Sequence, residues 1–171
     1  SYTATQHLIQ QGCKTIAHIS GNQNVDIFKS RMEGFKQALT DHQLTVHKEL
    51  IKETKNLSYD EGKVQAEALL EEKIMPDGIV CANDYTAVAT MKAFRNKGYK
   101  IPEEVAIVGF SNYPISAIME PQISTIDDSA YDMGRVAAKI LIQQIEDKDM
   151  QALDYQEVVI KTKLIIRDSS D

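Results

Sequence analysis

Polar side chains that can bind a ligand follow each strand-like run of this sequence. The run over residues 79–82, for example, is apolar and then stops at the pair Asn83-Asp84. Because ligands of open parallel α/β sheets bind at the carboxyl ends of the strands, such side chains would gather in one crevice. Hydroxyls, amides and carboxylates together match a polyhydroxylated ligand, which offers both donors and acceptors. The set comprises Ser20, Asn22, Asn56, Asn83, Asp84, Ser111, Asn112, Asp127 and Asp128.

The hypothesis of a ligand site depends most on Asn83, Asp84 and Arg31. Each strand-end residue alone fits an ordinary polar loop, so only their repetition indicates a site. We expect Asp84 to be the N-cap of the following helix and Asn83 to face the ligand. Arg31 lies near the start of the second predicted helix, beside the end of the first strand. Its planar guanidinium suits vicinal hydroxyls or an anion, although a solvated arginine fits the pattern equally well.

The sequence lacks the motifs that would indicate an enzyme. It contains no GxSxG, GxxxxGK[ST], GxGxxG or HExxH pattern. The four histidines have no metal-ligand spacing, and His18 falls within a strand, where a core role is expected. Cys81 ends a strand, but no histidine can be placed beside it. We therefore expect no catalysis, no cofactor and no metal, and a flavodoxin-like enzyme is the weakest functional alternative.

The composition is that of an ordinary globular domain. The 171 residues are 43% hydrophobic, and the net charge of −6 argues against this chain binding a phosphate backbone by itself. No apolar run approaches the roughly 20 residues of a membrane helix, so we expect no membrane partner. Cys13 and Cys81 form no CxxC motif, which favours reduced thiols in a cytoplasmic protein.

Helical and strand-like segments alternate along the chain. This alternation predicts an α/β fold with a mostly parallel sheet and helices on both faces. Such a fold normally begins with a strand, so the opening helix suggests that the native amino-terminal region is missing. We predict helices over 2–11, 27–40, 59–72, 85–97 and 129–146, with Ser58 as the cap of the third. We predict strands over 15–20, 50–51, 79–82, 105–110, 123–126, 157–160 and 164–166.

Four stretches in collinear order carry a family resemblance. They are "HLIQQGCKTIAHISG" (7–21), "SRMEGFKQAL" (30–39), "PDGIVCANDYTAVATMKAFRNKGYKIPEEVAIVGFSN" (76–112) and "PQISTIDDSAYDMGRVAAKIL" (121–141). Together they resemble the effector-binding domain of the LacI/GalR family of bacterial transcription regulators. The resemblance implies a periplasmic-binding-protein-like fold of two α/β lobes, with effector between them and a helix-turn-helix headpiece in front.

On this resemblance the chain is a truncated fragment. Residues 1–122 would be the carboxyl-side lobe, and residues 123–150 a strand and helix that cross into the mostly absent amino-side lobe. Residues 151–171 would return to the carboxyl-side lobe. The apolar stripe on the helix over 129–146 would lack its native partner, so we expect it to fold back onto its own sheet or to pack against another copy.

The resemblance also implies a set of ligand contacts. Arg31 and Asn83 match ligand-contact positions of the family. Ser111 stands where an aspartate is usual, Leu57 where many members place an aromatic ring, and Asp128 where a glutamine is common. Ser111 and Leu57 count against an ordinary neutral sugar, whereas Arg31 leaves room for a phosphorylated or acidic one. The predicted ligand-binding set is Arg31, Asn83, Ser111, Leu57, Asn22 and Asp128.

The leading functional interpretation is the effector-sensing domain of a cytoplasmic, DNA-binding transcription repressor. Its partners would be a small-molecule effector (a sugar, phosphosugar or related compound) and operator DNA, bound through a headpiece absent from this chain. A sugar-binding protein of a transport system is the alternative. A homodimer is also expected, and the resemblance places four apolar residues near its interface, although a core role fits them nearly as well. They are Val88, Met91, Ile118 and Met119.

Overall fold

A single six-stranded sheet lies at the centre of the protein, which the computed structural model describes over residues 1–146 and 157–171. Its strands are β1 (Ile16–Ser20), β2 (Ile51–Glu53), β3 (Gly78–Cys81), β4 (Ala106–Phe110), β5 (Ser124–Asp127) and β6 (Lys163–Ile165). In space they follow the order β2-β1-β3-β4-β5-β6. The first five pair in parallel, and β6 pairs antiparallel with β5. The predicted α/β class with a mostly parallel sheet is therefore confirmed.

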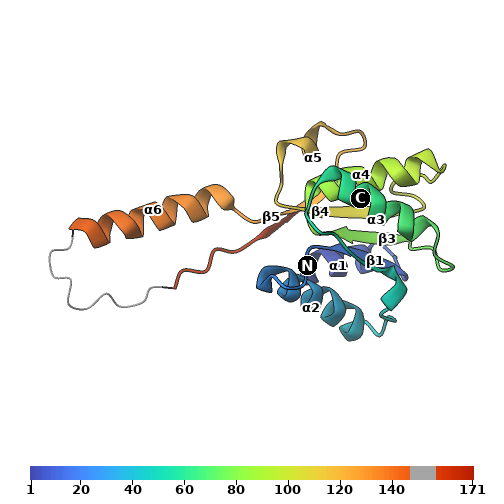
Figure 1. The fold of residues 1–171 in the computed structure, drawn as a ribbon, viewed down its shortest axis with the longest axis horizontal. Helices are drawn as coiled ribbons and strands as arrows, with labels where there is room; N and C mark the ends of the chain where they lie inside the picture. The colour runs from blue at the N-terminus through green and yellow to red at the C-terminus, as the bar shows by residue number, and fades with distance from the viewer. Residues whose placement is uncertain (147–156) are drawn as a thin grey trace.

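Helices cover both faces of this sheet, as Figure 1 shows. The helices are α1 (Tyr2–Gln10), α2 (Asp26–Asp41), α3 (Tyr59–Leu70), α4 (Asp84–Asn96), α5 (Pro114–Ile118) and α6 (Ala130–Glu146), with a short 3₁₀ turn η1 (Lys48–Leu50). The first pair, α1 and α2, packs on one face, and α3 and α4 pack on the other (Figure 1). The sequence did not predict α5, which at five residues is too short to show a helical period.

The central strands explain why the core has two layers. All residues of β1, β3 and β4 are buried, as expected of parallel strands that are covered on both faces. Successive side chains point to opposite faces. Val80 and Val108 pack in the same cluster as Phe35 of α2, whereas Ile79 and Ile107 pack in the cluster beneath α3 and α4.

The strand predicted over residues 123–126 does not leave this lobe, which corrects our expectation. As β5 it pairs with β4, with Ser124 opposite Val108 and Ile126 opposite Phe110. Ile123 and Thr125 are fully buried. The apolar side chains find their partners in this sheet, so only the segment after Asp127 departs from it.

The return segment forms one strand rather than two. Residues 157–160, a predicted strand, have no regular structure, and Val158 and Val159 are exposed there. Only β6 forms, and it adds to β5 at the edge of the same sheet. The predicted boundary between residues 150 and 151 lies outside the described residues. A last short stretch then joins the body, because the backbone of Ser169 bonds to Ile107 and Gln122.

Helix α6 extends away from the body, as the orange helix in Figure 1 shows. None of its residues is buried, and its apolar residues Met133, Leu141 and Ile145 are 45%, 57% and 73% exposed. Of the two expected arrangements, folding back onto its own sheet is therefore wrong, and packing against another copy stays a prediction. Its apolar stripe has no counterpart on the described part of the chain.

Candidate functional site

The exit of β3 is closed by a helix cap, and the cap is Asn83 rather than the predicted Asp84. Asn83 has an extended backbone, and its Oδ1 accepts a hydrogen bond from the Thr86 N–H at 2.9 Å. In return, the Thr86 hydroxyl accepts from the Asn83 N–H at 3.3 Å. This reciprocal pair is a capping box. The Asn83 Nδ2 donates to the Leu57 carbonyl at 2.9 Å, which joins two predicted ligand residues.

Asp84 has a structural role that the sequence did not reveal. Its side chain is fully buried, and its carboxylate accepts from the Tyr113 N–H at 2.6 Å and the Thr125 hydroxyl at 2.7 Å. A Cβ at Gly109 would lie 2.2 Å from its Oδ1, so only glycine leaves room for it. Burial raises the pKa of Asp84 to about 6, although these hydrogen bonds oppose the rise. Asp84 thus ties together the ends of β3, β4 and β5.

Arg31 reaches from α2 across the ends of β3 and β4. Its Nη1 donates to the Ala82 carbonyl at 2.8 Å, and its guanidinium carbon lies 3.5 Å from the centroid of the Phe110 ring. This is the geometry of a cation–π contact. Burial lowers the pKa of Arg31, and the negative charge of Asp128 partly opposes the shift. The guanidinium is therefore fixed at the strand ends, where the sequence predicted it.

Ser111 and Asp128 meet at the ends of β4 and β5. The Ser111 hydroxyl donates to Asp128 Oδ2 at 2.9 Å. Among the described residues, Asp128 Oδ1 is buried and has no hydrogen-bond partner. Ser111 has φ of 90° and Asn112 has φ of 49°, values that are uncommon outside glycine. Strain of this kind often accompanies functional sites.

Asn22 stands apart from this group. Its Oδ1 accepts from the Asn24 N–H at 2.8 Å in the turn after β1, and within the described chain it makes no hydrogen bond to the other predicted ligand residues. Its neighbour Gln23 fills the strand end instead, because the Gln23 amide donates to the Ser20 hydroxyl at 2.6 Å and the Gly21 carbonyl at 2.8 Å. Nothing in the sequence pattern distinguished Gln23 from Asn22.

Arg167, in the last residues of the chain, holds the loop that follows β4 and was not predicted as a site residue. Its guanidinium donates to Asn112 Oδ1 at 2.9 Å, to the Ser116 hydroxyl at 3.0 Å and to the Ile123 carbonyl at 2.8 Å. It therefore fixes the loop after β4 against α5. No local motif signals such a residue, since its partners lie more than forty positions away.

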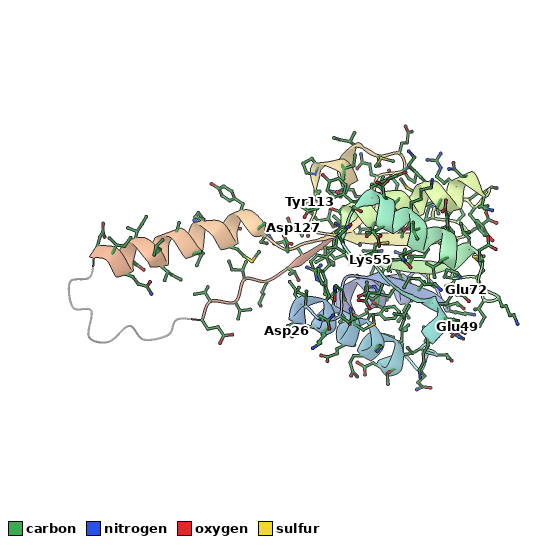
Figure 2. The ribbon with its side chains drawn as sticks, viewed as in Figure 1. Asp26, Glu49, Lys55, Glu72, Tyr113 and Asp127 are labelled. Carbon is green, nitrogen blue, oxygen red and sulfur yellow. The ribbon has the colours of Figure 1, made fainter. Side chains whose placement is uncertain are left out.

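The site lies at the edge of the body from which α6 departs. Figure 2 shows Tyr113 and Asp127, which follow β4 and end β5, together at this edge. Asp26, the first residue of α2, lies on the same side, whereas Glu72 lies on the opposite one (Figure 2). The edge therefore gathers the residues that follow several strands, as the parallel sheet requires.

Two reactive groups of the sequence are buried in the core. Cys81 is fully buried, and burial raises the pKa of its thiol to about 12, so it is not a nucleophile at neutral pH. His18 is also fully buried, stacked on Phe35 with ring centroids 4.9 Å apart, and its Nδ1 lies 2.8 Å from the Val80 carbonyl. The core position predicted for His18 is confirmed. No described helix is long and apolar enough to cross a membrane.

The four predicted interface residues divide into two groups. Met91 is fully buried and Val88 is 6% exposed, and both pack in the core beneath α4. The interface prediction is wrong for Met91, because a side chain inside the core cannot contact a second copy. Ile118 is 75% exposed, and Met119 is half-buried at the margin of the same core.

A parallel α/β lobe with polar side chains gathered at the strand ends defines a ligand-binding lobe. The sequence model of the periplasmic-binding-protein-like domain matches residues 5–170. The chain belongs to this family, in the form found in LacI-family transcription regulators, as the resemblance predicted.

Curated relatives and solved structures agree with this assignment. The ribose operon repressor of Halalkalibacterium halodurans is 35% identical over 98% of this chain and 48% of the relative. The transcriptional repressor PurR of Haemophilus influenzae is 33% identical over 98% of this chain and 50% of the relative. The chain therefore spans about half the length of the curated relatives it matches.

Two solved structures extend the comparison. The transcriptional regulator CelR in complex with cellobiose is 27% identical with a TM-score of 0.90, covering 98% of this chain and 50% of that one. A sugar-binding regulator of the LacI family from Escherichia coli, in complex with phosphate, is 28% identical with a TM-score of 0.86 and covers 98% and 59%.

Proposed function

We propose that this chain is the effector-sensing lobe of a DNA-binding transcription repressor that responds to a sugar or a sugar-derived ligand. The observation that carries the proposal is the gathering of these polar side chains at the strand ends, on one side of the body. Arg31 is anchored on Ala82 and Phe110, next to Asn83 and Ser111 respectively, and Ser111 holds Asp128. This set offers donors and acceptors on one edge, as a polyhydroxylated ligand requires.

In the proposed mechanism the ligand lies between this lobe and a second lobe. Its contacts with both lobes favour the closed arrangement, and closure determines whether two headpieces can occupy their half-sites on operator DNA. The second lobe, the headpiece, the homodimer and the cytoplasmic location all belong to the proposal. The repressor names of the curated relatives favour this function over the sugar-binding protein of a transport system.

Substitution of Arg31 tests the site. In the full-length protein, Arg31→Ala should weaken ligand binding by roughly 1–3 kcal/mol, the scale of a hydrogen bond to a charged group. Arg31→Lys should also weaken it, because lysine loses the planar fork and its stacking on Phe110. Isothermal titration calorimetry with the sugar that gives the largest thermal stabilisation measures both effects. Lys36→Ala, on the exposed side of the same helix, is the control. Unchanged affinity in Arg31→Ala would remove Arg31 from the site.

Self-association provides a second test, on the surface around Ile118. If this surface forms the homodimer contact, Ile118→Lys should convert the full-length protein to a monomer in sedimentation velocity, because a self-complementary contact places the new charges near each other. Ile27→Lys introduces the same charge at another exposed apolar side chain and should leave the dimer intact. A dimer that persists in Ile118→Lys would move the interface elsewhere.

A further inference from the structure

We propose that Asp128, oriented by Ser111, selects a neutral polyhydroxylated ligand over its phosphorylated counterpart. This inference rests on the proposed function and names the ligand class of the same site. It reverses the expectation from the sequence, where Ser111 counted against a neutral sugar because it replaces a carboxylate. The structure shows a carboxylate at the same place, supplied by the next strand end and bonded to Ser111 at 2.9 Å.

The unpartnered oxygen of Asp128 indicates what the ligand must offer. Within the described chain, Oδ2 accepts from the Ser111 hydroxyl, whereas Oδ1 is buried and accepts from nothing. A buried acceptor without a donor is unfavourable, so the site is complete only when a donor arrives. The Asp128 residue as a whole is only half-buried, so its side chain lies near the protein surface. A sugar hydroxyl supplies that donor.

A neighbouring carboxylate already performs the structural task at this turn, which leaves Asp128 free for a ligand. Asp127 Oδ1 accepts from the Ser129 N–H at 2.8 Å, and its Oδ2 accepts from the Asn112 amide at 3.3 Å. Asp127 thus closes the turn after β5 and ties it to the loop after β4. Asp128 makes no such backbone bond among the described residues, so its carboxylate is not needed to hold the turn.

Arg31 and Asp128 together suit a vicinal diol. The guanidinium has one hydrogen bond in the described chain, to the Ala82 carbonyl, and its remaining N–H groups can donate to hydroxyl oxygens. The same hydroxyls can donate their hydrogens to Asp128. A phosphate group at neutral pH carries no comparable donors, and the Asp128 charge repels it while Arg31 attracts it. The balanced pair of charges therefore favours a neutral ligand.

Calorimetry on the full-length protein tests the inference with matched probes: D-ribose against D-ribose 5-phosphate, and D-glucose and cellobiose against D-glucose 6-phosphate. We expect a neutral sugar to bind more tightly than its phosphorylated counterpart. Asp128→Asn should weaken binding of the neutral sugar roughly 10- to 100-fold, because the amide keeps the shape of the side chain but loses its charge. The preference for the neutral over the phosphorylated sugar should narrow or reverse. Asp26→Asn, which removes the charge of an exposed carboxylate on the same side of the body, is the matched control and should leave the preference unchanged.

Ser111→Ala keeps the inference testable if Asp128→Asn does not fold, because it removes only the bond that orients the carboxylate. Ser111→Ala should weaken binding of the neutral sugar several-fold, and the melting temperature of the free protein should change little. Tighter binding of a phosphorylated sugar by the unmodified protein, or an unchanged preference in Asp128→Asn, overturns the role of Asp128 and leaves the proposed function intact. If no sugar of either class binds, both the inference and the proposed sugar ligand are wrong.

Discussion

Removal of the Asp84 carboxyl should lower the free energy of unfolding by roughly 2–5 kcal/mol, because it leaves two donors unpaired at once. The Tyr113 N–H and the Thr125 hydroxyl both point at this carboxyl, which is fully buried. Asp84→Ala also opens a small cavity between the ends of β3, β4 and β5. Urea unfolding of the full-length protein, followed by a signal from this lobe, measures the loss. Asp84→Asn, which keeps one acceptor, should lose less.

Gly109 makes this prediction sharper through a double-mutant cycle. Gly109→Ala places a methyl group 2.2 Å from Asp84 Oδ1 and should destabilise the unmodified protein. In the Asp84→Ala background the carboxyl is absent, so the same methyl group should cost markedly less. Such coupling between contacting residues is typically 0.5–3 kcal/mol, so we expect about that much. Strictly additive losses would show that Asp84 does not occupy the space that Gly109 leaves open.

The pH dependence of stability should carry the same signature. Burial raises the folded-state pKa of Asp84 from 3.8 to about 6, so the folded protein holds this proton more tightly than the unfolded chain. The protonated Asp84 carboxyl therefore stabilises the folded state in full below about pH 3.8, and this stabilisation is lost as the pH rises through 6. The difference in unfolding free energy between the unmodified protein and Asp84→Asn should be larger at pH 4 than at pH 7. A difference that grows with pH would mean that hydrogen bonding outweighs burial.

The 171-residue chain by itself should self-associate through α6. Its apolar side chains Met133, Leu141 and Ile145 are about half exposed or more, and covering them would stabilise an assembly by roughly 3–6 kcal/mol. In the structure α6 does not pack on its own sheet, so a second copy is the available partner in a sample of this chain alone. Sedimentation velocity over a range of concentrations should show assemblies larger than the monomer.

Matched substitutions separate the stripe from the rest of α6. Leu141→Glu with Ile145→Lys leaves the net charge unchanged and should give a monomer. Asp132→Asn with Lys139→Gln changes exposed polar residues of the same helix, also at constant net charge, and should leave association intact. A chain that stays monomeric at every concentration while α6 remains protected from hydrogen exchange would contradict the exposed position of this helix.

Much of the fold was predictable because it depends on local pattern. Continuous apolar runs gave the buried strands β3 and β4, and helical spacing gave α2 and α4 within one or two residues. Ser58 was correctly predicted as the cap of α3, where its hydroxyl accepts from the Glu61 N–H. The partner of the strand over 123–126 was not predictable in this way, since the apolar pattern does not say which lobe buries it.

The sequence predicted which residues gather at the candidate site, but not the role and the contacts of each residue. The strand-end rule brought Arg31, Asn83, Ser111 and Asp128 to one edge. The cap was assigned to Asp84 instead of Asn83 because both side chains cap helices well. The structural role of Asp84 depends on donors from Tyr113 and Thr125, which lie far away in the sequence. Contacts between distant positions, such as Ser111 with Asp128, leave no mark on local sequence pattern.

The most direct test of the proposed effector site is hydrogen exchange of the full-length protein with and without the sugar that stabilises it most. We predict that the ligand slows exchange in the segments that follow β3, β4 and β5, around Asn83, Ser111 and Asp128, and at the start of α2 near Arg31. The loops at the amino-terminal ends of the strands, around Gly12 and Asp77, should exchange as before. Protection confined to those loops, or no protection at the carboxyl-terminal strand ends under saturating ligand, would contradict the assignment of these strand ends as the effector site.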